Sequence, residues 1–512
     1  MLLNRQNLPL ISRSLVELPR ADYFSLPEKV LQFGTGVLLR GLPDYYIDKA
    51  NKQGIFNGRI VVLKSTDGGD LDSFARQDGL YTHHLQGISD GRETIETVLN
   101  ASISRVLAAK NDWDKVLQLA RSADLRLVVS NTTEVGIVLV EDNIHNSLPV
   151  SFPGKLLAFL YERYKHFNGE PAAGLVIVPT ELIPQNADTL KSILLQLSDQ
   201  NNLEEGFRRW MEESNIFCNS LVDRIVPGKL PAPEAEAMDK KLGYQDELMI
   251  MSETYGLWAI ETSEERVKDI LSFYQCDGGV VITPDISIHR ELKLRLLNGS
   301  HTFTCGLAVL CGFDTVKQAM DNPVFEKFIS TLVMNEIAPS INCQGLSLEQ
   351  ARSFASKVLD RYRNPSLQHH WISITLHYSS KMNTRNASLV KKYLDQHSDI
   401  PSHMALGLAA WILFMNTEKT ADGYYIGQAG GKEYRVNDAQ APRFYELWKK
   451  YPTDELVDAV FSDKNIWQID MPGLPRLAAA VKKCLEALSE LGAMETMSRI
   501  VNAAEPAAKA NA

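Results

Sequence analysis

The sequence predicts an α/β domain followed by a mainly helical domain, and three observations support this fold class. Short apolar runs typical of buried strands recur between residues 29 and 282, and a turn containing two glycines follows the first of them. From about residue 286 onward, apolar residues recur mostly at helical spacing. Because 512 residues are too many for one core, we expect at least two domains, at residues 1–285 and 286–512.

The composition argues against several classes of protein. Hydrophobic residues make up 45% of the chain and charged residues 23%, which is typical of globular proteins. The net charge of −10 argues against a nucleic-acid partner, which would need a basic surface. The most apolar run, residues 405–415, is too short to span a membrane, and the N-terminus lacks the pattern of a signal peptide. The six cysteines are scattered without zinc-ligand spacing, so we expect reduced thiols, no metal and a cytoplasmic location.

The first predicted strand ends in a turn that suits a dinucleotide. A buried strand is predicted up to residue 33, and a helix is expected to begin directly after the turn and to continue through residue 47. The first amides of such a helix could hold a pyrophosphate. Leu39 replaces the third glycine of the usual fingerprint, and glycine turns without a ligand are common, so the turn alone is a weak signal. The candidate cofactor-binding residues here are Gln32, Phe33, Gly34, Thr35, Gly36, Val37 and Leu38.

Further strands are predicted at residues 59–63, 125–129 and 174–178. In an open parallel sheet, polar residues just past the carboxyl ends of the strands face the cofactor crevice. Asn131 and Thr132 take such a position after the strand at 125–129, and Thr180, Glu181 and Asn186 follow the last of the three. The alternative explanation of these polar residues is a simple turn with helix capping.

The end of the second strand departs from the usual NAD site. An acidic residue normally stands there to bind the ribose hydroxyls, but here Lys64 follows the apolar run and Asp67 is the first acid. A lysine at this position could meet the 2′-phosphate of NADP. It could also point to solvent, as most lysines do, while Asp67 reaches the ribose. The strand therefore leaves the choice between NAD and NADP open.

A polar helix opening at residues 291–301 carries three candidate catalytic residues, Lys293, Asn298 and His301. On an ideal helix, their offsets place them within about 140° of arc, so that all three could face one pocket. A lysine can transfer a proton, an amide can polarise a carbonyl oxygen, and an imidazole can orient a substrate. The structural alternative is a solvated lysine, an asparagine beside a glycine kink and a core histidine.

Two charged groups complete the candidate set. Asp223 and Arg224 lie inside an apolar segment, where a charge pair is often structural but can line a site. In the C-terminal half, a basic group could be a solvated surface or a clamp for a substrate carboxylate. We favour Arg361 as this clamp, with His369 as its helper. The basic group consists of Arg361, Arg363, His369, His370, Lys381 and Arg385.

Together these segments resemble the long-chain mannitol dehydrogenase family, from about residue 28 to residue 450. The motifs that carry the resemblance are Leu31-Gln-Phe-Gly-Thr-Gly36, Gln77-Asp-Gly-Leu-Tyr-Thr82, Ser130-Asn-Thr-Thr-Glu134, Leu221-Val-Asp-Arg-Ile225, Lys293-x4-Asn298-x2-His301 and Arg361-Tyr-Arg-Asn-Pro365. Each motif alone is weak, but their common order along the chain is specific. The segments at residues 152–156 and 162–169 are most similar to the uronate-acting branch of the family, the tagaturonate reductases.

The resemblance implies a Rossmann-type N-terminal domain, an all-α C-terminal domain and a site between them. It implies zinc-independent hydride transfer between the cofactor NAD(H) and a small-molecule substrate. The expected pair is tagaturonate and altronate, in hexuronate catabolism. In this scheme Lys293 is the general acid/base, and Asn298 and Asn186 cradle the reacting oxygen. Asp223 and His301 position the sugar.

Two alternatives remain open at this stage. Within the family, the substrate could instead be fructuronate or a neutral polyol such as mannitol. Outside it, the chain could be a non-catalytic sensor of sugar acids, although a sensor would not need the complete set of Lys293, Asn298 and His301. The oligomeric state does not follow from the sequence.

Overall fold

The structure is a computed structural model that describes residues 1–65, 71–132, 136–145 and 148–503. Asp67, the predicted partner of the ribose, lies outside these residues. The chain divides into two compact units, which are described separately below. The first consists of Met1–Gly87 and Glu93–Ile286, and the second of Ile88–Arg92 and Ser287–Ala512. The first unit is α/β and the second mainly helical, so the predicted fold class is confirmed.

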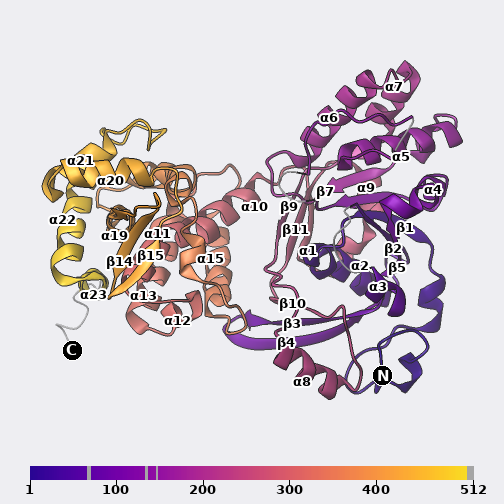
Figure 1. Ribbon diagram of the computed structural model, residues 1–512, viewed down its shortest axis with the longest axis horizontal. Helices are drawn as coiled ribbons and strands as arrows, with labels where there is room; N and C mark the ends of the chain where they lie inside the picture. Colours follow the sequence, from indigo (N-terminus) through magenta and orange to yellow (C-terminus); the bar gives the residue numbers. More distant parts are fainter. Residues whose placement is uncertain (66–70, 133–135, 146–147, 504–512) are drawn as a thin grey trace. The chain divides into compact units, whose positions relative to one another are not determined.

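The first unit is built on a six-stranded sheet with the strand order β5-β2-β1-β6-β7-β8 (Figure 1). All neighbouring strands in it are parallel. Its strands are β1 (Glu28–Phe33), β2 (Arg59–Lys64), β5 (Ile103–Ala108), β6 (Leu127–Ser130), β7 (Val176–Pro179) and β8 (Ile216–Phe217). The apolar runs predicted as strands correspond to β1, β2, β6 and β7, with ends that differ by one or two residues.

Each face of this sheet has its own core, because side chains alternate between the two faces of a strand. Along β1, Leu31 and Phe33 enter one core and Val30 enters the other. The core around Leu31 and Phe33 is covered by α4 (Ala109–Ala120), α5 (Phe152–His166), α6 (Asn186–Gln200) and α7 (Glu205–Ser214). The opposite core is covered by α1 (Val37–Gly41), α2 (Pro43–Lys52) and η4 (Ser272–Cys276).

Two smaller sheets add to the first unit. One joins β10 (Ile250–Ser252), β3 (Tyr81–Ser89) and β4 (Arg92–Asn100), and the other joins β12 (Val280–Thr283), β11 (Leu257–Glu261) and β9 (Ser220–Asp223). The remaining helices are η1 (Leu8–Leu10), η2 (Ala21–Ser25), α3 (Asp72–Arg76), η3 (Pro171–Ala173), α8 (Ala232–Leu242) and α9 (Glu265–Ile270).

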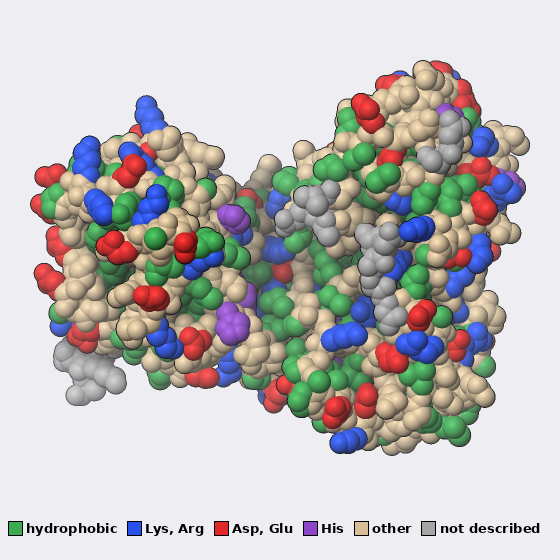
Figure 2. Space-filling model, in the orientation of Figure 1, with side chains coloured by type: hydrophobic (Ala, Val, Ile, Leu, Met, Phe, Trp, Pro, Cys, Tyr) green, Lys and Arg blue, Asp and Glu red, His purple; other side chains and the backbone are tan. Residues whose placement is uncertain are grey.

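The second unit surrounds one apolar helix, α19 (Ser402–Phe414), which packs against α11 (Ser300–Leu310) and α22 (Pro475–Leu491). A helix that is apolar on all sides is buried in the core, and this explains the run at residues 405–415. No helix in the described ranges is both long enough and apolar enough to cross a bilayer. On the face shown in Figure 2, basic and acidic side chains are interspersed on each unit.

The other α-helices of the second unit are α10 (Ser287–Leu292), α12 (Val316–Met320), α13 (Pro323–Thr331), α14 (Ala338–Ser340), α15 (Leu348–Arg363), α16 (Trp371–Ile374), α17 (Tyr378–Lys381), α18 (Ser388–Gln396), α20 (Ala441–Lys450), α21 (Thr453–Phe461) and α23 (Ala493–Ala503). Three π-helical segments interrupt them: η5 (Lys293–Gly299), η6 (Leu332–Ile337) and η7 (Met382–Ala387). In the sequence, residues 420–438 interrupt the helical spacing of apolar residues, which favours a loop. Within this range β14 (Tyr425–Ala429) and β15 (Lys432–Arg435) instead form an antiparallel sheet with β13 (Glu418–Lys419).

Candidate active site

The turn after β1 is held between two neighbouring strands. The amide of Gly34 donates to the carbonyl of Leu63 at 3.0 Å, and the amide of Asn131 donates to the carbonyl of Phe33 at 3.1 Å. Gly34 has a φ of 119°, and a Cβ at this position would lie 2.9 Å from the carbonyl oxygen of Asn131. Only glycine fits here, because a side chain would meet both an unfavourable backbone conformation and fixed backbone atoms.

The helix after the turn differs from the prediction. A continuous helix through residue 47 was expected, but Leu42 has φ −131° and ψ −75° and separates α1 from α2. Pro43 starts the second helix, where its missing N–H costs nothing. The amides of Val37 and Leu38, in the first turn of α1, have no acceptor among the described residues.

Space is available beside these amides for a phosphate. A Cβ added to the exposed Gly36 would meet nothing within 4 Å. Thr35, Val37 and Leu38 are half-buried, so the turn is accessible at the carboxyl edge of the sheet. Free amides at a helix start beside open space fit the pyrophosphate of a dinucleotide.

The side chains of Gln32 and Phe33 are buried in the protein interior next to the turn and do not face solvent. The side chain of Gln32 is fully buried and donates to Asp44 at 3.4 Å and to the carbonyl of Gly34 at 3.3 Å. Phe33 packs edge-on against Phe152 with ring centroids 4.8 Å apart. Burial raises the pKa of Asp44 to about 8, although Gln32 lowers it in part. These two predicted residues would therefore contact a cofactor only through their backbone.

Glu181 holds the polar turn after β6 and received no role from the sequence. Its carboxylate accepts hydrogen bonds from the amide and the hydroxyl of Thr132, both at 2.9 Å, and from the hydroxyl of Ser130 at 3.0 Å. Asn131 donates to the carbonyl and hydroxyl of Thr180 at 3.1 and 3.0 Å. Asn131 and Thr132 are thus fixed at the same sheet edge as Gly34. The signal in the sequence was the position of Glu181 directly after a strand.

Asn186 has a structural task that we did not predict. Its amide donates to the carbonyls of Pro179, Glu181 and Ser220, each at 3.1 Å, and its oxygen accepts from the amides of Ala187 and Ser220, each at 3.0 Å. The side chain is 1% exposed. An amide fully engaged by the backbone is not free to polarise a substrate oxygen, so the structure does not support Asn186 in the predicted cradle.

Asp223 and Arg224 are both buried, at the end of β9. The guanidinium of Arg224 donates to the carbonyls of Gly41 and Tyr255 at 2.7 and 2.8 Å, and it lies 4.7 Å from the ring centre of Tyr45. Arg224 therefore fixes the end of α1. Of the two roles considered, supporting the fold or lining a site, these contacts favour the structural one.

The sequence left two positions open for Lys64, beside a 2′-phosphate or in solvent, and the structure argues against solvent. Its residue is 8% exposed, because β2 lies inside the sheet between β1 and β5 and Lys64 pairs in register with Ala108. Lys64 is therefore not positioned as most surface lysines are.

In the second unit, Lys293 and Asn298 lie in the π-helical segment η5, where an α-helix was expected. A π-helix forms i→i+5 hydrogen bonds, so residues five apart are about one turn apart and share a face. Lys293 and Asn298 are both half-buried. His301 follows in the first turn of α11 and is 7% exposed.

Side chains from other helices bind the carbonyls of η5. Tyr362 donates to the carbonyl of Leu297 at 3.1 Å, and Asn386 donates to that of Gly299 at 3.1 Å. Arg385 donates to the carbonyl of Asn298 at 3.4 Å. These contacts from α15 and η7 fix the π geometry, which the sequence pattern did not reveal.

His301 lies in an aromatic pocket. Its ring centre is 4.3 Å from that of Tyr362, 5.2 Å from that of His369 and 5.8 Å from that of Trp371. Burial lowers the pKa of His301 well below its usual value, and His369 and nearby cations add to this effect. The ring is therefore neutral near pH 7. Its Nε2 atom is buried and has no hydrogen-bond partner in the part of the chain that the structure describes.

Three cations act on this imidazole, namely Arg361, Lys381 and Arg385. Arg361 is 5% exposed. Lys381 donates to the carbonyl of Ile374 at 3.1 Å, and Arg385 also lies 3.3 Å from the hydroxyl of Thr302. Within the described ranges, neither Lys381 nor Arg385 forms a salt bridge, although Asp438 acts electrostatically on Lys381. We call Arg361, Lys381 and Arg385 the cationic cluster.

The remaining members of the basic group differ. Arg363 forms salt bridges with Glu326 and Asp360, so it is already neutralised. His369 is half-buried, and burial lowers its pKa, followed in importance by His370 and Arg361. His369 is thus neutral near pH 7 and lies against His301. His370 is exposed.

Comparisons with known proteins cover nearly the whole chain. The mannitol dehydrogenase Rossmann domain matches residues 28–270, and the mannitol dehydrogenase C-terminal domain matches residues 285–489. Altronate oxidoreductase of Bacillus subtilis is 36% identical over 480 residues, which are 93% of this chain and 96% of the relative. Altronate oxidoreductase of Phocaeicola vulgatus is 35% identical over 480 residues, with 93% and 97% covered.

Solved structures agree on the fold. The ternary complex of Pseudomonas fluorescens mannitol 2-dehydrogenase with NAD and D-mannitol has a TM-score of 0.68 at 23% identity, covering 98% of this chain and all of that one. A D-sorbitol dehydrogenase in substrate-free form has a TM-score of 0.75 at 19% identity, covering 97% and 100%. The domain matches and the relatives together show that the chain is an oxidoreductase of the mannitol dehydrogenase family.

Proposed function

We propose that this oxidoreductase interconverts D-tagaturonate and D-altronate with NAD(H). The observation that carries the proposal is the cationic cluster of Arg361, Lys381 and Arg385, grouped around His301. A neutral polyol has no charge for three cations to meet, whereas a hexuronate carries one carboxylate. The names of the relatives at 34–36% identity point to the same substrate.

The cofactor is assigned to the turn after β1. The free amides of Val37 and Leu38, the open space beside Gly36 and the fixed Asn131 fit a dinucleotide. NAD(H) bound there supplies the hydride that is exchanged with the carbon bearing the reacting oxygen. The residues of this chain bind and orient it and handle the proton.

The proton is assigned to Lys293. During reduction, negative charge develops on the substrate oxygen, and Lys293 donates a proton to it while the Asn298 amide donates a hydrogen bond. Asn298 takes this role alone, because the amide of Asn186 is occupied by backbone groups. This proton transfer requires no metal ion.

We assign the hydroxyl groups of the sugar acid to neutral side chains and its carboxylate to cationic ones. The buried Nε2 of His301 can bond a substrate hydroxyl, which would give this orphaned atom its partner. The cationic cluster holds the carboxylate, with His369 packed beside it. Asp223 is proposed to bind a further sugar hydroxyl. We place the enzyme in the cytoplasm, in hexuronate catabolism.

A substrate panel tests the proposal. NADH oxidation is followed by its near-ultraviolet absorbance with tagaturonate, fructuronate and the neutral ketose fructose, and with NADPH as a cofactor control. We expect the largest kcat/KM for tagaturonate with NADH. The largest value for fructose would identify a polyol dehydrogenase. Binding of uronates without any oxidation of NADH would identify a sensor, and a preference for NADPH would assign Lys64 to a 2′-phosphate.

A further inference from the structure

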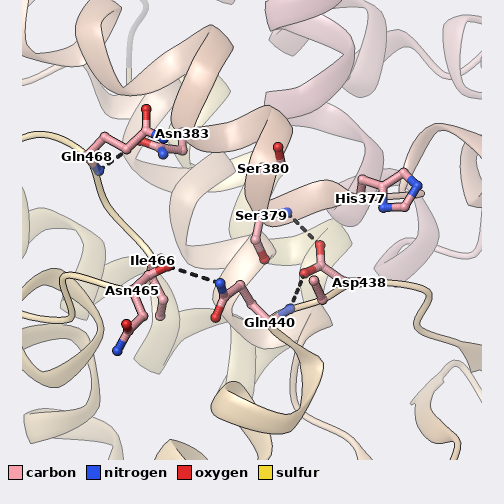
Figure 3. Close-up of a pocket in the computed structure, with 10 residues that line it drawn as sticks. His377, Ser379, Ser380, Asn383, Asp438, Gln440, Asn465, Ile466 and Gln468 are labelled. Carbon is pink, nitrogen blue, oxygen red and sulfur yellow. Dashed lines mark hydrogen bonds between the residues drawn. The ribbon is translucent and has the colours of Figure 1, made fainter. Parts of the chain in front are cut away.

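The second unit contains a small polar pocket outside the cationic cluster (Figure 3). Its volume is about 180 Å³, and residues from three separate segments line it, at positions 377–383, 438–440 and 465–468. The lining is formed mostly by amides and hydroxyls, among them Ser379, Ser380 and Asn383. One carboxylate, Asp438, one imidazole, His377, and two apolar residues, Ala439 and Ile466, complete it, and no lysine or arginine lines the pocket.

The walls are held in place by hydrogen bonds between the three segments. Asp438 accepts from the amide of Ser379 at 2.7 Å and from the amide of Gln440 at 2.8 Å. Gln440 donates to the carbonyl of Asn465 at 3.0 Å, and the amide of Gln468 donates to Asn383 at 3.2 Å. The pocket is therefore preformed, and a ligand would not have to order it.

The buried hydroxyl of Ser379 lacks a hydrogen-bond partner among the residues that the structure describes. The residue is 2% exposed. In Figure 3, this hydroxyl points into the space among the lining residues. A buried polar group left without a partner destabilises the folded protein, and a ligand hydroxyl would remove this cost.

We propose that this pocket binds a small neutral molecule with several hydroxyl groups. Hydroxyls both donate and accept, so they match amides, serines and a carboxylate that has free lone pairs. A carboxylate ligand is disfavoured, because Asp438 faces the pocket and no lysine or arginine lines it; Lys381 acts on Asp438 only from outside the lining. At about 30 Å³ per water molecule, the volume equals that of about six waters, which suits a short polyol of about four carbons.

This site is distinct from the proposed substrate site but lies on the same helical segment. Residues 378–396 form α17, η7 and α18 in succession. Ser379, Ser380 and Asn383 line the pocket, whereas Lys381 and Arg385 belong to the cationic cluster. The two sites therefore select opposite chemistry, a neutral ligand on one side and a carboxylate on the other.

Saturation-transfer NMR with the full-length protein and erythritol tests the proposal. We expect transfer to erythritol with a Kd in the millimolar range, as for a ligand with few atoms, and at least a fivefold weaker response for erythronate, its carboxylate analogue. Ser380→Trp fills the pocket from an exposed position and should abolish the transfer. Ser462→Trp, at an exposed position outside the pocket, is the matched control and should leave it unchanged.

A second variant addresses the buried hydroxyl. Ser379→Ala should weaken erythritol binding several-fold while thermal unfolding stays at or above the wild-type temperature, since an unpartnered buried group is removed. Equal transfer in the wild type and in Ser380→Trp would place erythritol elsewhere and overturn the proposal. So would equal responses for erythritol and erythronate, or the absence of any transfer.

Discussion

The glycine turn of the first unit and the cationic cluster of the second are built in different ways. The turn takes its residues from two short stretches, at positions 32–38 and 131–132, and each stretch lies at or directly after the end of a strand that its own apolar run predicts. The cluster takes Arg361 from α15, Lys381 from α17 and Arg385 from η7, and it surrounds a histidine on α11. A strand-end site can thus be located from one local pattern, whereas a helical site depends on how distant helices pack.

Disrupting the proton donor should have the largest effect. Lys293→Ala should lower kcat by about 10²–10⁴-fold, because a positioned acid/base contributes this much. NADH affinity, measured by fluorescence titration, should stay unchanged, since the cofactor turn belongs to the first unit. Lys317→Ala, in α12 and paired with Asp321, is the matched control and should retain full activity. Full turnover in Lys293→Ala would refute the assignment.

Removing a cation from the cluster should come next. Arg361→Met, our choice from the sequence, and Arg385→Met, which lacks a carboxylate partner in the described ranges, should each cost about 2–5 kcal/mol in tagaturonate recognition. The loss should appear as a higher KM for tagaturonate but not for a neutral ketose of equal length.

Arg363→Met serves as the control, because Arg363 is already paired with Glu326 and Asp360. Equal losses on the charged and neutral substrates would mean that the altered arginine supports the fold of η5, to which Arg385 donates a hydrogen bond. The clamp would then have to be sought at Lys381.

The sequence predicted the first unit more completely than the second for a physical reason. Apolar runs ending in Gly34, Asn131 and Glu181 are local signals, and parallel strands bring their ends to one edge. In the second unit, Lys293 and Asn298 were identified, but the π-helix that places them depends on Tyr362 and Asn386, which are far away in the chain. The burial of Lys64 and the backbone bonds of Asn186 also depend on tertiary contacts, so neither followed from the sequence.

The buried carboxyl group of Asp44 should make the unfolding free energy depend on pH. Burial raises its pKa to about 8, so the folded state keeps a proton that the unfolded state releases above its usual pKa of 3.8. Stability should therefore fall as pH rises through this window, by up to about 1.4 kcal/mol per pH unit or roughly 2.7 kcal/mol from pH 5 to pH 7. Urea unfolding followed by fluorescence should show this slope, and Asp44→Asn should flatten it.

Asp269→Asn is the control for this pH dependence, since Asp269 is exposed on α9 of the same unit. It should leave the slope unchanged. An identical slope in Asp44→Asn and wild type would show that another group titrates in this range.

Gly34→Ala should have a smaller effect, on both stability and cofactor binding. Its φ of 119° is strained for alanine, and the new methyl group would lie 2.9 Å from the carbonyl of Asn131. We expect a loss of about 1–3 kcal/mol in unfolding free energy. A lower thermal unfolding temperature together with weaker NADH binding would agree with this expectation. Unchanged values of both would mean that the turn can rearrange.

Gly36→Ala should have the smallest effect, and it separates the fold from the cofactor. Gly36 has a φ of −61°, which alanine adopts freely, and its added methyl group would meet no protein atom within 4 Å. The unfolding temperature should therefore equal that of the wild type. A dinucleotide whose pyrophosphate approaches the backbone here would meet the methyl group, so NADH affinity should fall about tenfold, or ~1.4 kcal/mol. Unchanged affinity would place the pyrophosphate away from this turn, even if Gly34→Ala weakens binding, because only Gly34 is needed by the protein itself.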